Sequence, residues 1–107
     1  MQKIFQLESL VRELGNKDQY FLEFLNSKSI ISGIIRLRPG ENDDQEPHQL
    51  DELYYVIDGD GYIEVNQENH PIKKGDIIFI PATVHHKFLK NKNILTVLYV
   101  FTTRSSE

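Results

Sequence analysis

Short apolar segments separated by turn residues recur along most of this 107-residue chain, and no other feature limits its possible folds as strongly. The segments are rich in Ile and Val, whose β-branched side chains favour strands, and the chain holds only one Ala. Evenly spaced short strands are typical of a β-sandwich or β-barrel. The sequence therefore predicts an all-β protein. The expected strands are residues 20–25, 30–37, 53–57, 62–66, 77–80, 84–89 and 94–101, with a further short one at Ile72.

The N-terminal region departs from this pattern. Leu7, Leu10, Val11 and Leu14 recur with the spacing of one face of an α-helix, and Gly15 follows where a helix often ends. We expect one short helix here. Its apolar face is expected to pack against the outside of a sheet.

Two turns between the predicted strands carry strong local signals. Residues 26–29, Asn-Ser-Lys-Ser, are expected to connect a first hairpin. Residues 58–61 read Asp-Gly-Asp-Gly, and Asp-Gly pairs supply the positive φ that tight turns need. A second hairpin is therefore predicted at residues 58–61.

Length, charge and composition exclude several classes of protein. A chain of this size is expected to form one domain, residues 1–107, around a single core. The absence of Cys excludes disulfides, thiolate metal sites and a thiol nucleophile. A formal charge of −4 argues against nucleic-acid binding, and the longest apolar run, residues 97–101, is far shorter than the roughly 18 residues of a membrane helix. Because no apolar leader begins the chain, a cytoplasmic location is expected.

Histidine and acidic residues gather in a window from residue 40 to residue 59. Glu46 and His48 are two residues apart, so on an extended strand their side chains leave the same face, and Glu52 lies four residues further on. Imidazole and carboxylate groups suit divalent zinc, iron, manganese, nickel or copper. The spacing therefore predicts one wall of a site for a single metal ion.

A second window, residues 75–90, offers a further imidazole. His85 and His86 are neighbours, and neighbouring residues of a strand point to opposite faces. Only one of them can face the interior, and strand parity alone leaves the choice open. Tyr54 and Phe88 share the parity of the inward-facing candidates and could line the same cavity, but we expect core packing from both.

Three other polar side chains are expected to lie outside this site. Arg36 and Arg38 precede the first window and could bind a substrate carboxylate, but we expect them to be outward-facing charges. His70 lies in a predicted turn region and is expected to face solvent.

The first window resembles a known sequence motif. Gly40, five residues, Glu46, one residue, His48, three residues, Glu52, six residues and Gly59 are similar to the first cupin motif, G-(X)5-H-X-H-(X)3,4-E-(X)6-G. The departure is Glu46, which stands where the motif has its first histidine.

The second window resembles the second cupin motif, G-(X)5-P-X-G-(X)2-H-(X)3-N. Gly75, Pro81 and His86 match it, while Thr83 replaces its glycine and Lys90 its asparagine. Fifteen residues separate the two motifs, a short spacer that resembles small single-domain microbial cupins of the conserved-barrel type. The resemblance implies a cupin jelly-roll β-barrel with one short N-terminal helix.

The resemblance also implies the residues that hold a metal ion. Carried over position by position, the ligands are His48, Glu52 and His86, so His86 is chosen over His85. Two histidines and one carboxylate form a facial set that leaves coordination positions open. Glu46 is either a fourth ligand, a catalytic base, or a residue that orients a ligand or a water.

Cupins of this kind are implied to act on small molecules. The expected function is that of a metal-dependent enzyme, an oxygenase such as a mononuclear dioxygenase or a related lyase or isomerase, with iron, manganese, zinc or nickel and a small organic substrate inside the barrel. The alternatives are a non-catalytic module that senses a metal or metabolite with a vestigial active site, and a storage or structural role. A homodimer is expected, with residues 20–24 and the last strand as candidate contacts.

Overall fold

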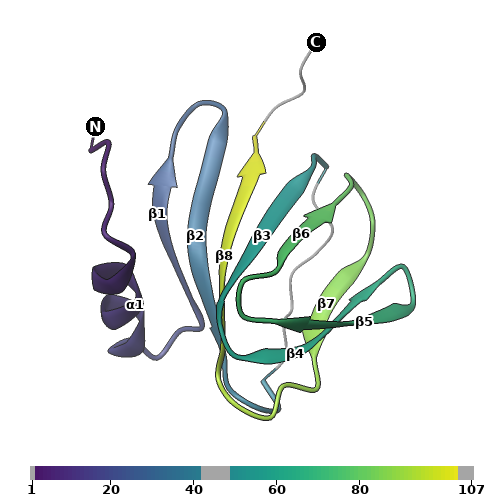
Figure 1. Cartoon of the computed structure of the whole chain (residues 1–107). Helices are drawn as coiled ribbons and strands as arrows, with labels where there is room; N and C mark the ends of the chain where they lie inside the picture. Colours follow the sequence, from purple (N-terminus) through teal and green to yellow (C-terminus); the bar gives the residue numbers. More distant parts are fainter. Residues whose placement is uncertain (1, 42–48, 104–107) are drawn as a thin grey trace.

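The computed structural model describes residues 2–41 and 49–103. One helix and eight strands make up this part of the chain (Figure 1). They are α1 (Leu7–Gly15), β1 (Phe21–Asn26), β2 (Ile30–Leu37), β3 (Glu52–Asp58), β4 (Asp60–Val65), β5 (Glu68–Lys73), β6 (Ile77–Ile80), β7 (His86–Leu89) and β8 (Leu95–Thr102). The mostly-β fold with one short N-terminal helix that the sequence predicts is confirmed.

The strands form two antiparallel sheets with a shared interior. The larger sheet has the order β1-β2-β8-β3-β6, and the smaller has the order β5-β4-β7. Figure 1 shows the smaller sheet folded across the lower part of the larger one. Because β3 belongs to the larger sheet and β7 to the smaller, inward side chains from both can meet between the sheets.

The second predicted hairpin, at residues 58–61, is wrong. β3 and β4 do not pair with each other but lie in different sheets, so the chain crosses from one sheet to the other at Gly59. Gly59 has a φ of 91°, and a Cβ at this position would collide with the carbonyl oxygen of Ile94. The Asp-Gly pair therefore marks a change of direction, as expected, but local turn chemistry does not determine which strands pair.

A second hairpin does exist, one turn later in the chain. Asn66 and Gln67 both have positive φ, 51° and 70°, and they join β4 to β5 with Val65 opposite Glu68. Positive φ at both central residues is the pattern of a two-residue hairpin turn. β5 is longer than the short strand predicted around Ile72. The sequence did not reveal its full length because five of its six residues are exposed and give no apolar pattern.

The core lies between the sheets and follows the alternation of the strands. In β3, Tyr54 and Val56 are buried, whereas Leu53 and Tyr55 are exposed on the other face. Residues of both sheets contribute to one cluster of buried side chains. Its members are Ile35, Leu37, Tyr54, Val56, Ile63, Ile72, Ile80, Phe88, Leu95, Val97 and Tyr99.

Helix α1 covers the outer face of β1 and β2, as the sequence predicts (Figure 1). Leu14 is the buried residue of the helix, and Arg36 reaches from β2 to the end of the helix. The guanidinium of Arg36 donates hydrogen bonds to the carbonyl oxygens of Leu14 at 2.8 Å, Lys17 at 3.2 Å and Gln19 at 3.3 Å. Arg36 is therefore neither a substrate ligand nor an outward charge, but a buried group that satisfies carbonyls at the C-terminal end of a helix.

The outer face of β3 and β6 is not covered within the described part of the chain. Leu53 lies opposite Phe79 and Tyr55 opposite Ile77, and the exposed fractions of these side chains run from 38% to 72%. These four residues form the exposed β3–β6 face. Among the described residues no helix has the length and apolar character needed to cross a membrane.

Candidate metal site between the two sheets

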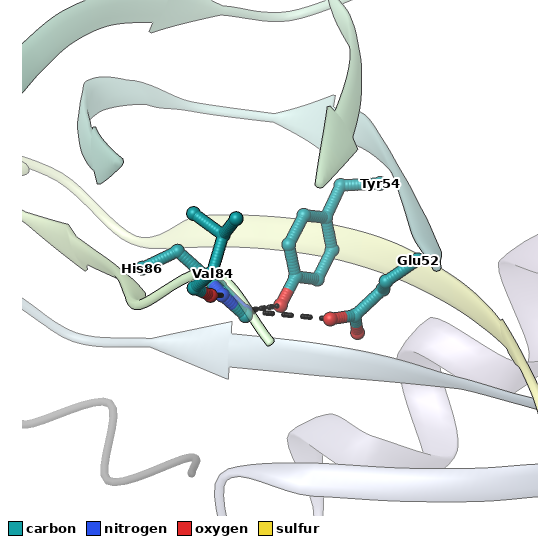
Figure 2. Close-up of polar contacts among 4 residues, drawn as sticks. All are labelled: Glu52, Tyr54, Val84 and His86. Atoms are coloured by element: carbon teal, nitrogen blue, oxygen red, sulfur yellow. Dashed lines mark hydrogen bonds and ion pairs between the residues drawn. The ribbon is translucent and has the colours of Figure 1, made fainter. Parts of the chain in front are cut away.

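Glu52 and His86 meet in the barrel interior. Glu52 is the first residue of β3 and His86 is the first residue of β7, and each points inward on its strand. His86 Nε2 lies 3.3 Å from Glu52 Oε1, and each side chain is only 1% exposed (Figure 2). A carboxylate and an imidazole from the two predicted windows, 34 positions apart in sequence, thus come into contact away from water.

The hydrogen bonds of His86 determine which ring nitrogen carries the proton. Nδ1 lies 3.0 Å from the carbonyl oxygen of Val84, which can only accept a hydrogen bond, so we assign the proton to Nδ1. Nε2 lies 2.9 Å from the Tyr54 hydroxyl, with which it shares a hydrogen bond. Figure 2 shows the Tyr54 hydroxyl and the Glu52 carboxylate on the same side of the imidazole. Nε2 is therefore the ring nitrogen that faces the interior, beside the Tyr54 hydroxyl and the Glu52 carboxylate.

Tyr99 reports on the electrostatics of the interior. Burial, followed by the negative charges of Glu23 and Glu52 and the nearby Tyr20, raises the pKa of Tyr99 to about 12. Tyr99 lies opposite Tyr54 in the pairing of β8 with β3. The Glu52 carboxylate, which disfavours a negative charge on Tyr99, would favour a positive charge in the same interior.

The Glu52 and His86 pair fits a metal ion. Two neighbouring ligands that each bind one ion at 2.0–2.2 Å are about 3 Å apart, close to the 3.3 Å between Nε2 and Oε1. Metal-binding histidines usually donate their other ring N–H to a carbonyl or carboxylate, as His86 does to Val84. Residues 2–41 and 49–103 contain no group of three or more His, Cys, Asp or Glu side chains placed to hold an ion. A complete site of that composition would therefore include side chains beyond these ranges.

The other predicted site residues fall into two sets. Glu46 and His48 lie outside the described residues. His85 is exposed on the opposite face of the chain from His86. His70 is also exposed, at 53%, with Nε2 3.8 Å from a Glu68 carboxylate oxygen.

The sequence predicts core packing for Tyr54, with lining of the cavity as the alternative. Tyr54 does pack there, with its ring 4.9 Å from that of Phe88 in an edge-to-face arrangement, and it is 1% exposed. Its hydroxyl also forms a hydrogen bond with Nε2 of His86, so it lines the interior beside Glu52 and His86 as well. The signal in the sequence was its position two residues after Glu52, which places both side chains on one face of β3.

The two departures from the second motif share a backbone feature. Thr83 and Lys90, which stand where the motif has Gly and Asn, have φ values of 67° and 58°. Glycine and asparagine adopt this left-handed conformation more readily than other residues. The chain therefore has a left-handed backbone at both positions where the motif has residues that readily adopt it.

Comparison with known proteins agrees with this architecture. A family model described as "Cupin domain" matches residues 33–101. An uncharacterized protein of Streptomyces coelicolor, SCO3923, is 36% identical over 104 residues, which cover 97% of this chain and 99% of that protein. Acireductone dioxygenase 1 of Sorghum bicolor is 35% identical over 60 residues, which cover 50% of this chain and 33% of that enzyme.

A solved structure shares the fold. KdgF from a Halomonas species superimposes with a TM-score of 0.70 and 17% sequence identity, covering 80% of this chain and 79% of that one. At this level of identity the likeness concerns the fold alone. This chain spans about a third of the length of the acireductone dioxygenase it matches.

Proposed function

The chain belongs to the cupin domain family, and on that premise we propose that it is a metal-dependent enzyme acting on a small organic molecule inside the barrel. The reaction class is that of an oxygenase, such as a mononuclear dioxygenase, or of a related lyase or isomerase. The observation that carries the proposal is the contact between Glu52 and His86, two buried side chains whose carboxylate and imidazole groups are suited to metal binding. Their interior position also supports a substrate within the barrel.

The proposed ligands are His48, Glu52 and His86, with Glu46 as a fourth ligand or as a base. A bound iron, manganese, zinc or nickel ion would supply Lewis-acid polarisation of a substrate oxygen or activation of dioxygen. Glu52 would supply a carboxylate oxygen from β3, and His86 would supply an imidazole nitrogen from β7. Nitrogen and oxygen donors of this kind suit all four metals, so the donor set alone does not select one.

The chain's own residues prepare the interior for such chemistry. The carbonyl of Val84 holds the imidazole of His86 in one orientation and fixes the proton on Nδ1. Tyr54, Phe88 and Tyr99 are buried around the site and exclude water, which strengthens electrostatic interactions inside. Tyr99 keeps its hydroxyl proton at neutral pH, because its pKa is raised to about 12.

The similarity to acireductone dioxygenases supports oxygen chemistry. For the Sorghum bicolor enzyme it covers 50% of this chain and 33% of that enzyme. One feature favours an alternative function: Glu46 replaces the first histidine of the motif, as expected of a module that binds a metal or metabolite without turnover.

Metal content tests the proposal most simply. We expect about one metal ion per chain by elemental analysis of protein purified without chelators, and loss of most of it in the His86→Gln variant. The matched control is His85→Gln, which removes the exposed neighbouring imidazole and should leave metal content unchanged. Less than about a tenth of an ion per chain, not restored by iron, manganese, nickel or zinc, would contradict the proposal. Full occupancy without turnover of any oxidisable or carbonyl substrate would favour the sensing module.

A second copy of the chain is the proposed partner. The exposed β3–β6 face continues onto the half-buried Leu98 and Val100 of β8, which lie opposite Tyr55 and Leu53. Contiguous exposed apolar surface of this kind marks interaction sites. Residues 20–24 offer less, since Phe24 packs its ring 4.9 Å from that of Phe5.

Light scattering tests this dimer. We expect the mass of two chains at micromolar concentration and the mass of one chain after Ile77→Lys, which places a charge on the most exposed side chain of the face. Phe21→Lys, on the exposed side of β1, is the matched control and should remain dimeric. A wild-type chain with the mass of a monomer would refute the dimer.

A further inference from the structure

A pocket of about 400 Å³ lies between β5 and β6. In the described part of the chain, β5 is the last strand of the smaller sheet and β6 is the last strand of the larger one, so the two strands do not pair with each other. Aliphatic side chains from three strands line the pocket: Ile63 and Val65 of β4, Ile72 of β5 and Ile78 of β6. The pocket therefore presents hydrocarbon from both sheets.

The aliphatic lining reaches into the core. Ile63 and Ile72 are 2% and 6% exposed and belong to the cluster of buried side chains. Val65 and Ile78 are half-buried and pack against that cluster. None of these four side chains can form a hydrogen bond, so this part of the pocket suits an apolar group.

The polar lining residues lie at the rim. His70 is exposed on β5. Asp76 precedes β6, and its carboxylate accepts a hydrogen bond from the backbone N–H of Lys73 at 2.9 Å. A molecule that enters past these residues passes from a polar rim to an apolar interior.

The pocket borders the candidate metal site. Val65 lies directly opposite His86 in the pairing of β4 with β7, and Ile78 lies directly opposite Tyr54 in the pairing of β3 with β6. Residues directly opposite each other point to the same face of a sheet, with Cβ atoms about 4.5–5.5 Å apart. We propose that this pocket binds the apolar end of the substrate while the polar end lies at Glu52 and His86. The inference deepens the proposed function and rests on it, because it requires a reaction at those two residues.

The pocket indicates the chemical class of the substrate. Sites for small molecules usually have volumes of about 300–1,000 Å³, and this pocket, near the lower end, accommodates a short alkyl chain or a single ring. Each methylene group transferred from water to such surroundings improves affinity about four-fold. The substrate is therefore an amphipathic molecule with a polar, oxygen-bearing end, and Val65 and Ile78 determine how long its apolar end can be.

Primary alcohols from 1-butanol to 1-octanol probe the pocket without any need for turnover. In nuclear magnetic resonance titrations of the wild type, we expect affinity to rise about four-fold per methylene until the alcohol fills the pocket, with shift changes at the amides of Val65 and Ile78. Ile78→Phe narrows the pocket and should weaken binding of 1-hexanol about ten-fold, the effect of roughly two methylenes. Ile78→Ala widens it, so affinity should continue to rise to a longer alcohol. The matched control is Ile94→Phe, which changes a side chain that is 49% exposed and outside the lining, and it should bind 1-hexanol as the wild type does.

Each outcome separates the inference from the proposed function. Alcohols that shift no amide, that shift only Leu53 and Tyr55 on the exposed β3–β6 face, or that bind with the same affinity at every length would overturn the inference while the metal site stands. A chain that binds alcohols in the pocket but holds no iron, manganese, nickel or zinc would overturn the proposed function, and with it the assignment of the pocket to a substrate. If Ile78→Phe does not fold, the wild-type shifts and Ile78→Ala decide.

Discussion

Replacement of Thr83 by glycine is predicted to stabilise the protein. Thr83 is exposed and has a φ of 67°, in the left-handed region that a β-branched residue rarely adopts. It lies in the turn before β7, where the Val84 N–H donates to the Pro81 carbonyl at 3.3 Å. Removal of an exposed side chain from this position loses little packing and relieves the backbone.

The size of the effect follows from two opposing contributions. A left-handed backbone raises the free energy of an L-residue by roughly 1–2 kcal/mol, and glycine does not carry this cost. Glycine also gains freedom in the unfolded chain, which offsets about 0.4–1 kcal/mol. A net gain near 1 kcal/mol corresponds to a rise in Tm of about 4 °C for a chain of this size.

Thermal unfolding followed by circular dichroism measures this change. The matched control is Thr102→Gly in β8, an exposed threonine without positive φ, which should lower the free energy of unfolding by about 0.5–1 kcal/mol. Equal losses of stability in Thr83→Gly and Thr102→Gly would show that the backbone at Thr83 is not strained and would refute the reasoning.

Three further predictions concern buried groups. The pKa of Tyr99 is about 12 in the folded protein against 10.0 in the unfolded chain, so its contribution to stability is complete below pH 10 and is lost between pH 10 and 12. In urea unfolding, the free energy of unfolding of Tyr99→Phe should therefore fall less steeply with rising pH than that of the wild type. An equally steep fall would contradict this prediction. Gly59→Ala should lower the free energy of unfolding by at least about 2 kcal/mol, because the new Cβ would collide with the Ile94 carbonyl and because the backbone at this position has positive φ. A loss below about 0.5 kcal/mol in urea unfolding would be inconsistent with that collision. Arg36→Met should speed hydrogen exchange of the α1 amides roughly ten-fold or more, since it removes the donors to Leu14 and the carbonyls that follow it; unchanged exchange would mean that Arg36 does not anchor the helix.

Local patterns in the sequence anticipated most of the fold. The spacing of Leu7, Leu10, Val11 and Leu14 identified α1, and alternation within β3 identified its buried face. These patterns succeed because each reflects burial of one face of one element. They say nothing about pairing over long distances, which is why the turn at residues 58–61 was assigned to a hairpin rather than to the crossing between sheets.

The candidate site shows the same division. Strand parity placed Glu52 on an inward face, but it could not choose between His85 and His86, and only the resemblance to cupin motifs did so. The role of Tyr54 was missed because parity distinguishes inward from outward and does not reveal that its hydroxyl reaches Nε2 of a residue 32 positions away. Likewise, an arginine on β2 gave no local sign that it binds the end of α1.

The position of a bound ion tests the central claim most directly. Crystals of the chain loaded with zinc, measured at the zinc absorption edge, would locate the ion in an anomalous difference map. We predict a peak about 2.0–2.2 Å from both His86 Nε2 and a carboxylate oxygen of Glu52. A peak at the exposed His85 or His70, with no density between β3 and β7, would contradict it.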